Sequence, residues 1–152
     1  MWMAGEGASV QPGVLLARGV CRALLQHGWS VLTEVTLANG RRADVVALAG
    51  DGEIAIVEVK SSLEDFRADR KWAEYREFCD TLYFAVPDTF PTELIPLECG
   101  LIGADAFAAE ILRPAPVLRL APARRKAMTL RFAQLAAQRL QRLTDPGLGM
   151  LV

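Results

Sequence analysis

This chain of 152 residues has few of the residue types that hold transition metals or carry out redox chemistry. Its three cysteines, Cys21, Cys79 and Cys99, are odd in number and widely spaced, and none belongs to a CxxC pair. We therefore expect them to be reduced residues of the core. The single histidine, His27, excludes any site that needs two imidazoles from one chain, and its place before Gly28 predicts the end of a helix.

Long apolar runs are missing as well. Hydrophobic residues make up 52% of the chain, but no run approaches the roughly 20 apolar residues that a membrane-spanning helix requires. The N-terminal stretch MWMAGEGASVQPG has no basic region followed by an apolar one, so no signal peptide is expected. Glycine-rich phosphate loops, Ser-His-Asp sets and cysteine nucleophile patterns are absent too. These absences predict a cytoplasmic protein without a membrane partner.

Negative charge is almost absent from the C-terminal part of the chain. Residues 1–110 contain nine Lys or Arg against seventeen Asp or Glu, whereas residues 111–152 contain eight against one. A distribution of this kind predicts an electropositive surface beside an acidic centre, and such a surface attracts polyanions. We expect a nucleic acid as the partner, with four basic residues of the C-terminal helix among those that bind it: Arg124, Arg125, Lys126 and Arg131. A solvated polar helix face is the alternative.

The length predicts a single domain over residues 1–152 with a core of its own. We expect residues 1–12 and 144–152 to be flexible tails. The apolar stretch Val14–His27 predicts a buried first helix. After it, three β-rich runs separated by Asn39-Gly40 and by Gly50-Asp51-Gly52 predict an antiparallel meander.

The second half of the chain predicts two more helices and three more strands. Ser61 and Ser62 begin a capping box, so a helix should run to about Cys79. TLYFAVP, CGLIGAD and AEILR have the pattern of strands, and Pro122 to Leu143 is helical. At 100° per residue, the apolar side of this last helix contains Phe132, Ala133, Ala136, Ala137, Leu140 and Leu143. The resulting order, αβββαβ with additions, predicts an α/β fold with helices flanking a sheet.

Three charged residues lie at one end of the central hairpin. A three-residue loop, Gly50 to Gly52, sets Asp44 opposite Glu58, and the strand period of two puts Lys60 on the face of Glu58. Two carboxylates about 5 Å apart across a ladder repel each other unless a cation or a shared proton lies between them. Mg²⁺ or Mn²⁺ suits this position, because hard cations prefer oxygen ligands. The alternative is an exposed strand end with solvated charges.

Neighbouring residues are candidates to support this centre. With a two-residue Asn39-Gly40 turn, Glu34 points to the face of the sheet away from Asp44. With one more residue in the loop, Glu34 would point to the same face as Asp44 and would be an additional acid of the site. Arg42 enters the strand just before Asp44, where it either meets a phosphate or neutralises the acids. Asp65 and Asp69 are expected to have a structural role near a helix N-terminus.

The pattern of Asp44, thirteen intervening residues and then Glu58-Val59-Lys60 resembles the PD-(D/E)XK nuclease superfamily. More closely, the segments GRRADVVAL, IVEVKSSLEDFRADRKWAEYREFCDTLYFAV, GLIGADAF and RRKAMTLRFAQLAAQRL resemble the MmcB family of DNA-repair endonucleases. This resemblance extends from about Val14 to Leu143.

The resemblance implies a PD-(D/E)XK core in which a metal ion sits where two strands diverge. It implies Asp44 and Glu58 as metal ligands and Lys60 as the catalytic lysine, although the proline that names the superfamily is replaced by Ala43. In related nucleases, a polar residue and a tyrosine of the second helix hold the substrate phosphate. Lys71 and Tyr75 have the same spacing in this sequence. For that pair, a surface lysine lying on a tyrosine is the alternative.

The function expected from the sequence is therefore that of a Mg²⁺-dependent DNA endonuclease in repair. An alternative from another class is a catalytically inactive, nuclease-like module that binds DNA or a repair partner. A third is an α/β domain that touches no nucleic acid. A homodimer and a repair-protein partner both stay open.

Overall fold

The computed structural model describes residues 9–150. Of the tails expected to be flexible, residues 1–8 and 151–152 lie outside this range, and Pro146–Met150 forms a short 3-10 helix. The other elements follow the chain in the order α1 (Pro12–Gln26), β1 (Ser30–Thr36), β2 (Arg42–Leu48), β3 (Ile54–Val59), α2 (Leu63–Ala68), η1 (Trp72–Phe78), β4 (Thr81–Val86), η2 (Thr92–Leu94), β5 (Gly100–Ala104), β6 (Ala109–Arg113) and α3 (Pro122–Thr144).

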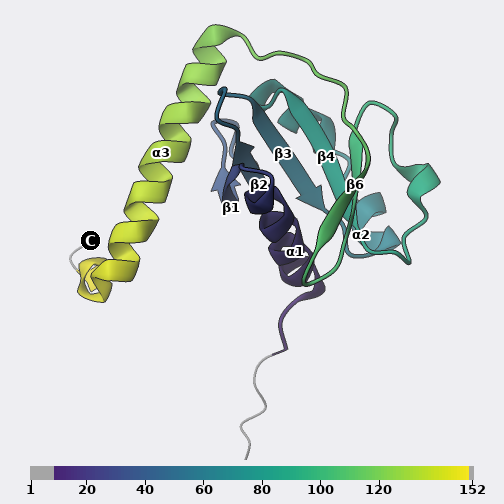
Figure 1. The fold of residues 1–152 in the computed structure, drawn as a ribbon, viewed down its shortest axis with the longest axis horizontal. Coiled ribbons are helices and arrows are strands. Elements are labelled where there is room, and N and C mark those ends of the chain that lie inside the picture. Colours follow the sequence, from purple (N-terminus) through teal and green to yellow (C-terminus); the bar gives the residue numbers. More distant parts are fainter. Residues whose placement is uncertain (1–8, 151–152) are drawn as a thin grey trace, which may run out of the picture.

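The six strands form one mixed sheet in which spatial order equals sequence order. The meander β1–β2–β3 is antiparallel, β4 and β5 continue it in parallel, and β6 closes it antiparallel to β5. Helix α1 lies on one face of the sheet and α2 on the other (Figure 1). The predicted α/β fold, with helices flanking a mixed sheet, is confirmed. Within residues 9–150, no helix is long and apolar enough to cross a membrane.

Helix α1 forms where the sequence predicted a buried helix. Pro12 occupies its first turn, where a missing N–H costs nothing, and Gly28, with a φ of 86°, follows its C-terminal cap. The buried residues of the helix, Leu16, Val20 and Leu24, pack on the sheet. Burying each such side chain stabilises the fold by about 1.5–3 kcal/mol, so this face fixes the helix against the sheet.

The hairpin between β2 and β3 has the predicted register. Ala49 N–H donates to Glu53 O across the three-residue loop at 2.9 Å, and Val45 pairs with Val57. The expectation of a two-residue turn between β1 and β2 is wrong. Leu37 N–H donates to Arg41 O at 2.7 Å, so this loop also contains three residues. The extra residue shifts β1 by one position and sets Glu34 opposite Asp44.

The second helix is not continuous to Cys79, contrary to the prediction. Ser62 caps it as expected, accepting from the N–H of Asp65 at 3.1 Å, but α2 ends at Ala68 and a 3-10 helix begins at Trp72. Phe66 and Trp72 both pack edge-on against the ring of Phe84. Six residues apart, they would point 120° away from each other on one α-helix, so the break lets both rings reach the sheet.

Helix α3 lies beside the β1 edge of the sheet, along the left of Figure 1. Its buried residues are Met128 and Leu135, whereas Leu140 is 61% exposed and Leu143 is 79% exposed. The predicted apolar face is therefore only partly correct: Phe132 packs against the core as expected, but Leu140 and Leu143 face away from it. Inward-facing arginines of the helix bind carboxylate and carbonyl oxygens of the body, and these contacts set its rotation.

Candidate functional site

Strands β2 and β3 part after the Val45–Val57 pair, and two carboxylates occupy the place where they diverge. The N–H of Asp44 donates to Glu58 Oε2 at 2.9 Å, and the N–H of Val59 donates to Asp44 Oδ2 at 2.8 Å. Each carboxylate thus binds a backbone amide of the opposite strand. The predicted juxtaposition of Asp44 and Glu58 is confirmed, and these reciprocal bonds fix one oxygen of each acid.

Both acids are removed from water and lie beside each other. Glu58 is only 3% exposed, and its burial, with the neighbouring charge of Asp44 as a second cause, raises the pKa of Glu58 to about 8. Burial also raises the pKa of Asp44, although the N–H of Val59 opposes the shift. Without a cation the pair therefore holds a proton at neutral pH. A cation between the two acids would take the place of that proton.

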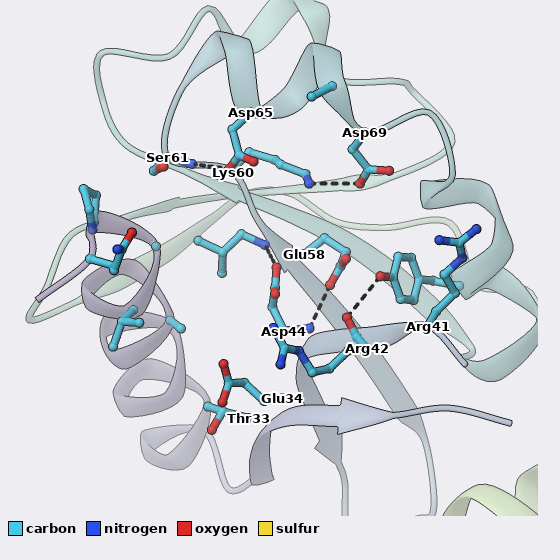
Figure 2. Close-up of a pocket in the computed structure, with 18 of the residues that line it drawn as sticks. Thr33, Glu34, Arg41, Arg42, Asp44, Glu58, Lys60, Ser61, Asp65 and Asp69 are labelled. Atoms are coloured by element: carbon cyan, nitrogen blue, oxygen red, sulfur yellow. Dashed lines mark hydrogen bonds and ion pairs between the residues drawn. The ribbon is translucent and has the colours of Figure 1, made fainter. Parts of the chain in front are cut away.

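Lys60 continues β3 beyond the acids and is held by Asp69. Its backbone N–H donates to Ala85 O at 2.9 Å, and its Nζ lies 2.9 Å from Asp69 Oδ2. Figure 2 shows this ion pair between Lys60 and Asp69. Burial alone would lower the pKa of Lys60, but the hydrogen bond and charge of Asp69 outweigh it and raise the pKa. Lys60 is therefore a protonated, oriented cation at neutral pH.

Asp69 is a residue of the site whose role sequence reasoning missed. It was expected to stabilise the N-terminus of a helix, but it is the C-terminal cap of α2. Its Oδ2 binds Lys60, and its Oδ1 accepts the N–H of Lys71 at 2.9 Å. The turn after α2 aims its carboxylate back at Lys60. No periodic pattern could reveal this contact, because it depends on the break between α2 and η1.

Tyr75 closes the site on the side of η1. Its hydroxyl donates to the carbonyl oxygen of Arg42 at 3.1 Å, which ties η1 to the first residue of β2. Burial, with the charge of Glu58 as a second cause, raises the pKa of Tyr75, so its hydroxyl stays protonated. Tyr75 thus braces the strand end that carries Asp44. Sequence reasoning placed Tyr75 here as a substrate-binding residue, and that role stays a prediction.

Glu34 lies opposite Asp44 on β1 and has an unusual backbone conformation. Its φ is 51°, and among the described residues it is the only non-glycine residue with a positive φ. For a residue with a side chain, this left-handed region costs about 1–3 kcal/mol, and such strain concentrates at functional sites. Figure 2 shows Glu34 next to Asp44. The three-residue turn that the sequence left open is what brings this acid to the site.

These residues line a cavity of about 1240 Å³. Its walls come from the start of α1, from β1, from the diverging ends of β2 and β3, and from the break after α2. The acids in the lining are Glu34, Asp44, Glu58, Asp65 and Asp69. The bases in the lining are Arg18, Arg41, Arg42, Lys60, Arg70 and Lys71. An acidic centre surrounded by basic side chains suits an anionic substrate that approaches together with a cation.

The predicted basic residues of α3 lie outside this cavity lining. Arg125 forms an ion pair with Asp80, whose side chain is 2% exposed, and also donates to Gly52 O at 2.7 Å. Arg124 lies over the ring of Phe78, 4.5 Å from its centre. Of the other two, Arg131 donates to Thr36 O at 3.4 Å, and Lys126 is exposed. Arg125 is thus a structural residue, and substrate binding by the group stays a prediction.

The donors at the diverging strands fit a hard divalent cation. Among residues 9–150, no three His, Cys, Asp or Glu side chains come together to hold a metal, so the protein would supply the two carboxylates of Asp44 and Glu58. Mg²⁺ is usually bound in this way, by one or two carboxylates, with water and substrate phosphate completing its octahedron. The unfavourable burial of two adjacent acids is the observation that favours such an ion.

Comparison with known proteins gives one family and one structure. The sequence model of a family described as DNA repair protein MmcB-like matches residues 4–147. A solved structure described as SPO1766 protein of unknown function, from Silicibacter pomeroyi, has a TM-score of 0.88 and 52% sequence identity to this chain. The match covers 91% of this chain and 94% of that one. No curated protein matches the chain.

Proposed function

The chain belongs to the MmcB-like family of DNA repair proteins, and from this premise we propose that it is a metal-dependent nuclease that hydrolyses phosphodiester bonds of DNA. The observation that carries the proposal is the pair of buried acids, Asp44 and Glu58, facing each other in a large cavity with basic walls. The meander β1–β3, α2 and β4 follow the strand and helix order of PD-(D/E)XK nucleases, which supports the same reading.

Asp44 and Glu58 would hold the metal ion. When bound, Mg²⁺ or Mn²⁺ supplies charge for the phosphate oxygens and makes water a better nucleophile. The acids contribute their geometry, because the amides of Val59 and Asp44 hold one oxygen of each carboxylate in place before substrate arrives. A donor set fixed in advance needs little reorganisation when the ion binds.

Lys60 has a different task in this proposal. Its ammonium group, which Asp69 keeps protonated and oriented, faces the same cavity as the acids and can offset negative charge that develops on the phosphate. Arg42 and Lys71 line the wall beside it and can bind the phosphates on either side of the scissile bond. The exposed bases of α3 would then hold more distant parts of the DNA backbone.

A second candidate is a nuclease-like module that binds DNA without cutting it. Two observations favour it: the ion pair that engages Lys60 with Asp69, and the absence of a third acid within ligand distance among the described residues. Such a module would bind DNA in a salt-dependent manner through the basic residues, with no role for the metal ion.

Metal binding and DNA cleavage measured on the same variants distinguish the two candidates. Calorimetry with Mn²⁺ and incubation with flap, branched and single-stranded DNA should be carried out on the unmodified protein, on Asp44→Asn, on Glu58→Gln and on Lys60→Ala. We expect Asp44→Asn and Glu58→Gln to lose both Mn²⁺ binding and cleavage. We expect Lys60→Ala to bind Mn²⁺ but to cleave at least about 100-fold more slowly, because removing one group that stabilises charge in the transition state typically costs this much in rate.

Glu64→Gln is the matched control, because Glu64 is an exposed glutamate of α2 that does not line the cavity. It should behave like the unmodified protein in both assays. DNA binding without Mn²⁺ binding or cleavage would favour the non-cutting module. Cleavage that survives in Glu58→Gln would show that the acid pair is not the active site.

A further inference from the structure

The left-handed conformation of Glu34 is part of a paired irregularity in two strands. Leu32 and Val35 both pack in the core on the α2 side of the sheet, although an odd separation should place them on opposite faces. On β2, Ala43 and Val46 do the same. Both strands therefore change face together at the position where Glu34 lies opposite Asp44. The β1 strand end is shaped so that Glu34, an exposed acid, lines the same cavity as Asp44 and Glu58.

A side chain from α3 holds this irregularity. β1 is an edge strand, so the carbonyl groups on its outer side have no neighbouring strand to bind. Arg139 donates from one guanidinium nitrogen to Thr33 O at 2.6 Å and from the other to Glu34 O at 2.9 Å. A guanidinium group is planar and presents its donors in a rigid fork, so it fixes the relative direction of two consecutive carbonyls. It binds the peptide groups on both sides of the strained residue.

Arg131 provides the contrast within the same helix. It also reaches β1, but it makes one longer contact, 3.4 Å to Thr36 O, beyond the irregular position. Arg131 covers the strand edge, whereas Arg139 fixes a conformation. Nothing in the basic character of α3 distinguishes these two arginines, since both are charged residues of one helix.

We propose that Arg139 is a positioning residue that holds Glu34 in the left-handed conformation, and that Glu34 serves the Asp44–Glu58 centre as its third acid through an intervening water molecule. The proposal rests on the nuclease function proposed above. It gives α3 a role in the active site that does not require the helix to touch DNA. It also gives a reason for a strained glutamate opposite Asp44, where glycine would adopt the same backbone without cost.

The test compares Arg139→Gln and Arg139→Lys with Arg131→Gln, which removes the same charge from the same helix. Mn²⁺ affinity is measured by calorimetry, and the amide signals of residues 33–35 are followed by NMR in the metal-free protein. We expect both Arg139 variants to bind Mn²⁺ about tenfold more weakly, as for a lost outer-shell partner, and to shift these amide signals. Arg131→Gln should change neither. Lysine keeps the charge but cannot span two carbonyls, so Arg139→Lys isolates the fork geometry.

Glu34→Gln completes a double-mutant cycle. We expect it to weaken Mn²⁺ binding about tenfold by itself, and the double variant with Arg139→Gln to be no weaker than Glu34→Gln alone, because Arg139 acts through Glu34. Additive losses of Mn²⁺ affinity, unchanged Mn²⁺ affinity of Arg139→Lys, or equal behaviour of the Arg139 and Arg131 variants would overturn the role of Arg139 but not the nuclease proposal. Absence of Mn²⁺ binding by the unmodified protein would overturn the nuclease proposal and this inference together.

Discussion

Raising the pH of the metal-free protein should destabilise its fold, because Glu58 must lose a proton inside the site. Burial and the charge of Asp44 raise the pKa of Glu58 from its ordinary value of 4.5 to about 8. The folded protein therefore binds more protons than the unfolded chain between these two values. The stability that protonated Glu58 contributes is fully present below pH 4.5 and is lost as the pH rises to about 8.

The magnitude is large compared with the stability of a small domain. One pKa unit corresponds to about 1.4 kcal/mol, so the free energy of unfolding should fall by about 1.4 kcal/mol per pH unit in this window, and by roughly 5 kcal/mol in total. Domains of this size unfold with only about 5–15 kcal/mol. Asp69 and Asp80 do not contribute in this window, because their pKa values are lowered and both titrate at more acidic pH.

Urea unfolding in EDTA at four values between pH 5.5 and 8.5 measures this slope. Glu58→Gln cannot ionise, so its stability should vary much less with pH and should exceed that of the unmodified protein at pH 8.5. Glu64→Gln should keep the full slope. Saturating Mn²⁺ should restore stability at pH 8.5 in the unmodified protein and in Glu64→Gln but not in Glu58→Gln, since the ion binds the ionised pair in the folded state. Parallel curves for the unmodified protein and Glu58→Gln would refute the assignment of the proton to this site.

Three further predictions concern charged groups in the site and outside it. Asp80→Asn should lower the free energy of unfolding by about 3 kcal/mol in urea titrations without changing Mn²⁺ affinity, because it removes the buried partner of Arg125 outside the cavity. Asp69→Asn should lower the pKa of Lys60, which NMR titration of the Nζ signal would show, and should move the alkaline limit of cleavage to lower pH. Lys126→Gln should reduce the slope of log Kd against log salt by about 0.9 in DNA-binding titrations if this exposed lysine contacts one phosphate, and an unchanged slope would remove it from the interface.

Much of the fold could be predicted from local patterns. The loop Gly50 to Gly52 fixes the β2–β3 register, and that register alone sets Asp44 against Glu58. Likewise, Pro12 and Gly28 bound α1 as their backbone preferences predict. Such features depend on residues close together in the chain, where turn geometry and strand periodicity act directly.

The failures concern contacts between distant segments. The second helix was expected to continue through Asp69, because its sequence has no helix-breaking residue there, but the rings of Phe66 and Trp72 both pack on Phe84. The apolar face of α3 was only partly predicted: Phe132 packs against the core, but Arg139 faces inward to bind the edge of β1 while Leu140 stays exposed. In each case tertiary contacts override a local preference of modest size.

The sequence by itself therefore determined the central meander, the register of its β2–β3 hairpin and the pair Asp44 and Glu58. Only the tertiary structure decided that Asp69 holds Lys60 and that Arg139 holds the backbone of Glu34. The physical reason is that the pair depends on a hairpin of fewer than twenty residues, whereas Arg139 and Glu34 are 105 positions apart. A periodic pattern carries information over one strand or helix, but a guanidinium group finds its carbonyl partners only after the sheet edge and the last helix have packed together.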